Sequence, residues 1–169
     1  LGTQYLKDYR DRVLLRDKEV PVIPTGIPVV DEHLKRGGLA AKQLGLFLAP
    51  PGRGKTMALQ HVIKSATIRR KKAAVYTLEM SELEYCERLD TSITGVSISS
   101  HNADLGKLFR RLSKVSKASG NSLIIKEFPA YSATIQDIEA HLSMLENNLK
   151  FVPDVVIVDY AELLMPSTR

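Results

Sequence analysis

Short apolar runs alternate along the chain with longer segments in which apolar residues recur every three or four positions. The runs predict strands, and they cover residues 43–48, 73–78, 122–126 and 154–158. The longer segments predict helices, and they cover about residues 55–70, 81–93, 105–119 and 135–149. The last run is apolar on both faces, which favours a parallel sheet covered on both sides. The pattern predicts an α/β domain, with a mostly parallel sheet and helices on both faces.

Polar residues mark where several of these helices begin and end. Ser81 and Glu84 have the spacing of a capping box, in which each side chain bonds the other residue's backbone N–H. Thr134 and Asp137 indicate a second cap, and Gly120 with Asn121 ends the helix between them.

An amphipathic helix is predicted ahead of this region, over residues 3–16. Its apolar side carries Tyr5, Leu6, Tyr9, Val13 and Leu14. Prolines and a glycine between residues 21 and 28 then end the helical pattern. We expect residues 1–20 to be a linker helix and residues 21–169 to be the core. The apolar side would be buried either against its own domain or against a neighbouring subunit.

One predicted helix has a strongly basic side, made of Lys107, Arg110, Arg111, Lys114 and Lys117. A solvated face is the common outcome of such a pattern, and a nucleic-acid surface is the alternative. The whole chain of 169 residues has a net charge of +5. This charge permits an anionic partner, although a nucleotide would suffice.

Composition excludes several classes of protein. Apolar residues make up 44% and charged residues 25%, the balance of an ordinary globular domain. No apolar run reaches the ~18 residues of a membrane span, and no secretory leader is visible. Cys86 is the only cysteine, so no internal disulfide forms, and we expect a buried helix residue in a cytoplasmic protein. The four histidines are scattered, which argues against a transition-metal site.

The candidate chemistry begins between the first predicted strand and the first core helix. Residues 49–56 satisfy seven of the eight positions of the phosphate-binding pattern G-x-x-x-x-G-K-[ST], with Ala49 in place of the first glycine. Glycines let backbone N–H groups turn toward phosphate oxygens, and the helix start adds its positive end. We expect the nucleotide-binding residues to be Ala49, Pro50, Pro51, Gly52, Arg53, Gly54, Lys55, Thr56 and Met57.

Two further positions complete a hydrolytic site. Asp159 ends an apolar strand, as in a Walker B element, and is expected to hold Mg²⁺ together with the hydroxyl of Thr56. Glu79 follows the second strand, where a carboxylate can orient a water and take its proton. Glu162 is the second candidate for that base. Lys55 would stabilise charge on the β- and γ-phosphates.

These residues together resemble the ATPase domain of the DnaB-type replicative helicases, within the RecA-like superfamily. Leu78-Glu79-Met80-Ser81 matches the family's S-L-E-M-S segment, with Thr77 where serine is usual, and Val158-Asp159-Tyr160 resembles its I-D-Y. Similarity also covers the entry to the core, Thr25-Gly26-Ile27-Pro28 with Asp31 and Gly37-Gly38-Leu39, and residues 124–145. Ala161-Glu162-Leu163 departs from the family's L-Q-L.

The resemblance implies an ATP- and Mg²⁺-dependent DNA helicase that works in DNA replication. Members form rings, usually hexamers, that move on single-stranded DNA, with ATP between subunits and an arginine from the neighbour completing the site. We expect this chain to be the first part of such a domain, starting at Leu1 and stopping soon after Asp159, and to hydrolyse ATP poorly by itself. A RadA- or RecA-type recombination ATPase and a KaiC-like regulatory ATPase with protein partners are the alternatives.

Overall fold

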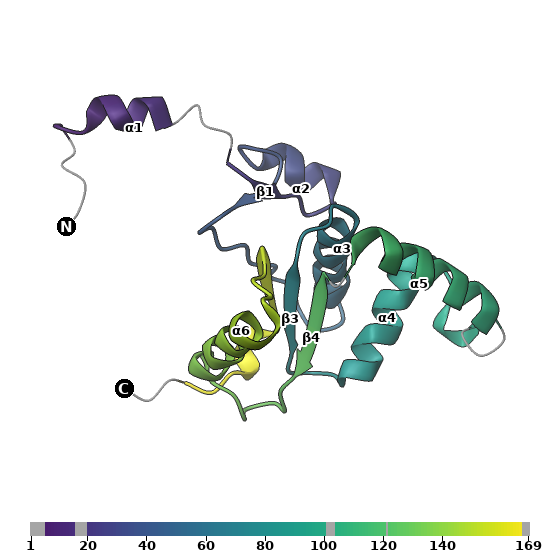
Figure 1. Cartoon of the computed structure of the whole chain (residues 1–169). Helices are drawn as coiled ribbons and strands as arrows, with labels where there is room; N and C mark the ends of the chain where they lie inside the picture. The colour runs from purple at the N-terminus through teal and green to yellow at the C-terminus, as the bar shows by residue number, and fades with distance from the viewer. Residues whose placement is uncertain (1–5, 16–19, 101–103, 121, 167–169) are drawn as a thin grey trace.

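A computed structural model describes residues 6–15, 20–100, 104–120 and 122–166 of the chain. At its centre lies a three-stranded parallel sheet in the order β4-β3-β5 (Figure 1). Strand β3 (Ala73–Thr77) lies between β4 (Leu123–Glu127) and β5 (Val155–Asp159). The register aligns the last residue of β3 with the last residues of both neighbours. The carboxyl ends of all three strands therefore meet at one edge.

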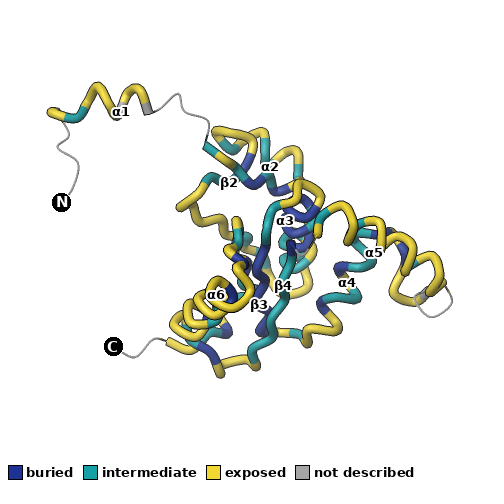
Figure 2. The backbone as a smooth tube through the Cα atoms, viewed as in Figure 1, coloured by how far each residue is buried: buried dark blue, intermediate teal, exposed yellow. Residues whose placement is uncertain are grey.

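Helices cover both faces of this sheet, as the sequence predicts. On one face, α3 (Lys55–Ile68) and α4 (Glu82–Thr94) pack against Val75 and Ile157. On the other face, α6 (Ile135–Leu149) packs against Ala74 and Tyr76. The helix α5 (Leu105–Ser119) packs beside α4 and α3 and extends away from the sheet (Figure 1). Figure 2 shows the buried residues concentrated in the strands and on the inner sides of the helices that cover them. The α/β prediction is confirmed.

Capping follows the sequence closely. Thr134 and Asp137 form a complete capping box at the start of α6. At the start of α4, the Ser81 hydroxyl accepts a hydrogen bond from the Glu84 N–H. Because polar side chains satisfy N–H groups that no helical carbonyl can reach, these pairs fix where the helices begin.

Residues 20–40 lead into the core through small elements that the sequence indicates only as an extended approach. Strands β1 (Val22–Ile23) and β2 (Leu39–Ala40) pair antiparallel, with α2 (Pro28–His33) between them. The Asp31 carboxylate accepts hydrogen bonds from the Thr25 N–H, the Thr25 hydroxyl and the Gly26 N–H. Burial opposes ionisation of Asp31, but these bonds outweigh it and hold its pKa below the usual value. This carboxylate closes the turn that precedes α2.

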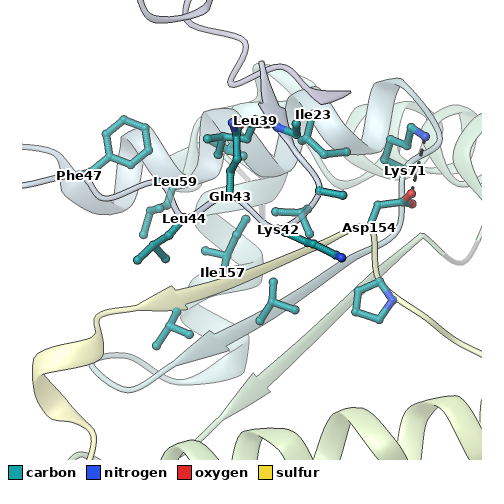
Figure 3. Close-up of a pocket in the computed structure, with 18 of the residues that line it drawn as sticks. Ile23, Leu39, Lys42, Gln43, Leu44, Phe47, Leu59, Lys71, Asp154 and Ile157 are labelled. Carbon is teal, nitrogen blue, oxygen red and sulfur yellow. Dashed lines mark hydrogen bonds and ion pairs between the residues drawn. The ribbon is translucent and has the colours of Figure 1, made fainter. Parts of the chain in front are cut away.

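The prediction of a strand over residues 43–48 is wrong. These residues have no regular structure, and Leu44, Leu46 and Leu48 are 92%, 72% and 79% exposed. They run beside the outer edge of β5 and enclose with it a cavity of about 730 Å³ (Figure 3). Among the described residues β5 pairs only with β3, so its outer edge makes no ladder. Without ladder hydrogen bonds to a partner, an apolar run does not become a strand.

The first helix is shorter than predicted. Helix α1 spans Tyr9–Leu15, and residues 3–5 and 16 of the predicted helix lie outside the described part of the chain. Tyr9, Val13 and Leu14 are exposed, and α1 stands apart from the sheet and its helices (Figure 1). Its apolar side is therefore uncovered. No helix in the described ranges is both long and apolar enough to cross a bilayer.

A histidine joins α6 to the sheet. Tyr76, fully buried on β3, has its hydroxyl 2.9 Å from His141 Nδ1, and its ring stacks on Phe128. Burial lowers the pKa of His141, the nearby Lys126 charge lowers it further, and Glu82 opposes this shift. The folded protein therefore favours neutral His141.

This contact predicts acid sensitivity of the fold. As pH falls through about 6.5, the unfolded chain binds the His141 proton first, so the free energy of unfolding declines by up to about 1.4 kcal/mol per pH unit. His141→Asn keeps a polar group but does not titrate, and we expect it to reduce this decline. Urea unfolding between about pH 7.5 and 5.5 measures the difference. His61→Asn, at an exposed histidine of α3, is the matched control and should behave like the unmodified chain.

Candidate active site

The loop before α3 has the backbone conformation that the phosphate-binding pattern predicts. Gly52 and Gly54 have φ angles of +71° and +85°, a region that other residues enter at a cost. A Cβ at either position would meet no atom within 4 Å, so the backbone angle and not lack of space requires glycine. Helix α3 begins at Lys55 with no side chain capping it. The N–H groups of its first turn are available to an anion.

The other predicted nucleotide-binding residues are contiguous with this loop. Pro50, Pro51 and Arg53 are exposed, Ala49 and Thr56 are half-buried, and Met57 is 73% exposed on the first turn of α3. The Lys55 ammonium lies 4.8 Å from the centre of the Tyr160 ring. The ring therefore holds the lysine by a cation–π contact at the mouth of the loop. Tyr160 was missed as a site residue, although its position directly after Asp159 was a signal.

Asp159 lies beside the loop with an unusual degree of burial for a carboxylate. It is 2% exposed, and the Thr56 hydroxyl lies beside its carboxylate. Its Oδ1 atom has no hydrogen-bond partner among the described residues. Burial raises the pKa of Asp159, and the charge of Glu79 raises it further. The neighbouring Thr56 hydroxyl and the charges of Lys55 and Arg88 lower this pKa only in part.

These donors fit a magnesium ion. Mg²⁺ uses one or two protein oxygens and takes its other ligands from phosphates and water. Asp159 supplies a buried, unsatisfied oxygen, and the Thr56 hydroxyl adjoins it. Within the described ranges no group of three His, Cys, Asp or Glu residues forms a metal cage. A phosphate-assisted site is thus the kind that this arrangement allows.

Glu79 lies in a tight turn just beyond β3, at the same sheet edge as Asp159. The Leu78 N–H donates to the Asp159 carbonyl at 2.9 Å. The buried Thr77 hydroxyl donates to the Met80 carbonyl at 2.9 Å and accepts from the Met80 N–H at 3.3 Å. Glu79 itself is exposed. The turn therefore projects its carboxylate outward from a fixed backbone.

A second pair of carboxylates holds this edge together. Glu82 accepts a hydrogen bond from the Glu127 N–H, and Glu127 accepts one from the Glu82 N–H. The pair joins the start of α4 to the end of β4, directly after the Glu79 turn. Neither role was predicted from the sequence, because the two residues are 45 positions apart.

Glu162, the other candidate base, lies on the short 3₁₀ helix η2 (Ala161–Leu163) and is exposed. The charges of Glu79 and Glu162 both raise the pKa of Tyr160, after burial as the largest cause. Of the two acids, Glu79 is the one whose charge contributes to the pKa of Asp159. The structure brings Lys55, Thr56, Glu79 and Asp159 to one place, whereas the large cavity beside β5 is lined by other residues.

Comparisons with known proteins place this geometry in a family. A model of the DnaB-like helicase C-terminal domain matches residues 22–169. A DnaB-like replicative helicase of Enterobacteria phage T4 is 23% identical over 167 residues, covering 95% of this chain. The chain spans 34% of the length of that relative.

Two solved structures share the fold. One, described as an ATPase domain, superposes with a TM-score of 0.75 at 20% identity, over 99% of this chain and 60% of that one. A DnaB-like replicative helicase, in a structure describing its interactions with primase, gives a TM-score of 0.71 at 20% identity, over 99% and 41% of the two chains. The RecA-like α/β fold expected from the sequence is therefore confirmed.

The burial of Asp159 predicts that the site reduces stability. A carboxylate with a raised pKa is disfavoured in its charged form, so at neutral pH it destabilises the folded state and the effect fades as pH falls. We expect Asp159→Asn to raise the free energy of unfolding in the absence of nucleotide. The same variant should lose the stabilisation that Mg²⁺ with ATP gives. Thermal unfolding with and without Mg²⁺ and ATP measures both.

The control is an aspartate just before the same strand. Asp154 accepts a hydrogen bond from the Lys72 N–H at 2.8 Å and pairs with Lys71 at 3.6 Å. Asp154→Asn should lower stability and leave the effect of nucleotide unchanged. If Asp159→Asn lowers stability as well, the carboxylate is satisfied in solution and the metal assignment loses its support.

Proposed function

The chain belongs to the DnaB-like helicase C-terminal domain family, and we propose that it binds ATP with magnesium and hydrolyses the terminal phosphate. One observation carries the proposal: a buried carboxylate oxygen of Asp159 without a partner, next to Thr56 and a loop that offers backbone N–H groups. A strand-end aspartate that only caps a turn would have its oxygens satisfied. The arrangement suits a metal-bound triphosphate.

Each residue of the loop has a distinct role in this proposal. The backbone of residues 49–54 and the start of α3 surround the phosphates, and Lys55 leaves the Tyr160 ring to contact the β- and γ-phosphates. Thr56 and Asp159 hold the magnesium. When bound, this ion neutralises charge that develops on the phosphates.

Glu79 is the proposed base. A water that attacks the γ-phosphate must be oriented and must lose a proton, and a carboxylate in a rigid turn can do both. The exposed side chain of Glu79 lies at the sheet edge that also presents Asp159. Its turn is fixed by Thr77 and by the Glu82–Glu127 pair, so the backbone that carries the carboxylate is positioned before the nucleotide arrives.

The family and α1 support a proposal for the larger assembly. We propose that residues 1–20 form a linker helix whose exposed Tyr9, Val13 and Leu14 pack on a neighbouring subunit. Residues 21–169 would then be the ATPase core within a hexameric ring that acts on single-stranded DNA in the cytoplasm. The phage relative and one structural neighbour are replicative helicases by name, and the other neighbour is an ATPase domain. These names favour this function over a recombination or regulatory ATPase.

The chain by itself should hydrolyse ATP slowly. In related ATPases an arginine from a neighbour stabilises the transition state and is worth about 10³–10⁵ in rate. Binding needs only the loop, Lys55, Thr56 and Asp159. Binding and turnover are therefore measured separately in the two predictions below.

Lys55→Ala should weaken triphosphate binding at least tenfold, because an ionic hydrogen bond contributes about 1.5–3 kcal/mol. Titration with a fluorescent ATP analogue in the presence of Mg²⁺ measures the affinity. Lys64→Ala is the control, since Lys64 lies on the same helix but bonds the Ser92 carbonyl. Equal affinity in Lys55→Ala and the unmodified chain would count against the loop as the phosphate site.

Glu79→Gln should keep nucleotide affinity and lower single-turnover hydrolysis by about 10²–10⁴-fold, the usual contribution of a general base. Phosphate release with protein in excess over ATP measures the slow turnover of the chain. Glu162→Gln should leave the rate nearly unchanged. The opposite result, slow hydrolysis in Glu162→Gln and normal hydrolysis in Glu79→Gln, would assign the base to Glu162.

A further inference from the structure

The net positive charge of this protein equals the charge of one helix. The chain has 24 lysines and arginines against 19 aspartates and glutamates. Helix α5 contains five basic residues and no acidic one, so the rest of the chain carries 19 of each sign. The whole excess of +5 therefore belongs to 15 consecutive residues.

Four of these cations form one row on the outer side of the helix. Lys107, Arg110, Lys114 and Lys117 are exposed and follow each other at helical spacing, over about 15 Å at 1.5 Å per residue. We call them the α5 basic row. Lys107 has one distant acidic neighbour, Asp104 at 3.9 Å, and Arg110 Nε bonds the Gly106 carbonyl of its own helix.

The fifth cation has a structural use. The Arg111 guanidinium donates to the Thr94 carbonyl at the end of α4 and so helps to attach α5 to the body. The inward side of α5 is made of Leu108, Leu112 and Val115, which are half-buried. Packing of the helix thus uses neither the basic row nor Phe109.

An aromatic ring lies beside the row. Phe109 is 78% exposed and lines a shallow hollow together with Lys107, Arg110 and Lys114. Figure 2 shows α5 exposed along its length. Exposing an aromatic ring to water is unfavourable. The packing of this chain does not place Phe109 on the surface for any structural reason. Cations that alternate with an exposed aromatic ring suit a strand of phosphates that also presents flat bases.

We propose that the α5 basic row and Phe109 bind single-stranded DNA, with phosphates along the row and a base stacked on the ring. The surface is separate from the ATP site, since the hollow beside Phe109 is lined by α5 residues and includes neither the loop, nor Glu79, nor Asp159. The choice of DNA rests on the proposed function. An acidic protein or an anionic membrane would match the charges, but neither calls for a lone exposed ring among them.

The test measures binding of a fluorescein-labelled oligothymidylate to the chain by anisotropy, without nucleotide, over a range of KCl concentrations. The triple variant Lys107→Glu, Arg110→Glu, Lys114→Glu should lose binding at least tenfold. The slope of log Kd against log salt concentration should decrease by about 2, since each of the three lost phosphate contacts contributes roughly 0.7 to this slope on a single strand. Phe109→Leu keeps the charges and should weaken binding at least about fivefold with an unchanged salt slope.

The matched control reverses three exposed cations elsewhere, Lys35→Glu, Lys42→Glu and Arg70→Glu, and changes the net charge equally. It should bind DNA nearly as well as the unmodified chain at moderate salt. Equal losses in both triple variants would overturn the proposal, as would normal binding in the α5 variant. Binding to phosphatidylserine vesicles or polyglutamate but not to the oligonucleotide would also overturn it.

Failure of this proposal is distinguishable from failure of the proposed function. DNA binding is measured without ATP, and none of the substitutions touches the loop, Glu79 or Asp159. If Lys55→Ala binds ATP normally while the α5 variant loses DNA, the ATP assignment fails and the DNA surface stands. If the α5 variant binds DNA normally while Lys55→Ala loses ATP binding, the DNA surface fails and the ATP assignment stands.

Discussion

The parallel register between β3 and β5 is the constraint on which the site depends. It places Thr77 opposite Asp159, and the Leu78 N–H extends the ladder to the Asp159 carbonyl. Glu79 must then emerge at the edge where Asp159 ends its strand. In a parallel sheet, shifting one strand by one residue changes which residues lie opposite each other at the strand ends. The shift also moves the side chains of that strand to the other face. Such a shift would separate the proposed base from the proposed metal ligand. The apolar contacts of Val75 and Ile157 with α3 and α4 therefore maintain the distance between Glu79 and Asp159 as well as the core.

Helix α3 connects this register to the phosphate loop. Its inner side places Val62, Ile63 and Ala66 in the core, with Ile63 and Ala66 fully buried, while its first residues belong to the proposed anion site. Because the helix is anchored along its length, Lys55 and Thr56 are fixed relative to β5. The burial of Asp159 is the cost of this arrangement, since the packing that positions the carboxylate also removes it from water. Stability and binding are opposed at this residue.

Most of the architecture could be predicted from local signals, and the exceptions have one physical origin. Strands 73–77 and 155–159, the helix caps and the glycines of the loop depend on neighbouring residues, so periodicity and spacing identify them. The run at residues 43–48 has equally strong periodicity, but a strand also needs a partner, and pairing is not a local property. The same reason hid the contact of Lys55 with Tyr160 and the Glu82–Glu127 pair, which join segments far apart in sequence. Glu79, Thr56 and Asp159 were found because their motifs are local, although their roles stay proposals.

The two proposed anion sites of this chain differ in the range over which they act. The loop would recognise phosphate through backbone N–H groups and through Lys55, close to a buried carboxylate, so its contacts are short and weakly screened. The α5 basic row presents flexible, solvated cations whose field reaches about a Debye length of 8–10 Å and weakens with salt. The remainder of the chain has no net charge. In this proposal a long anion would bind along α5 mainly through its charge, whereas a compact triphosphate would be selected at the sheet edge by geometry.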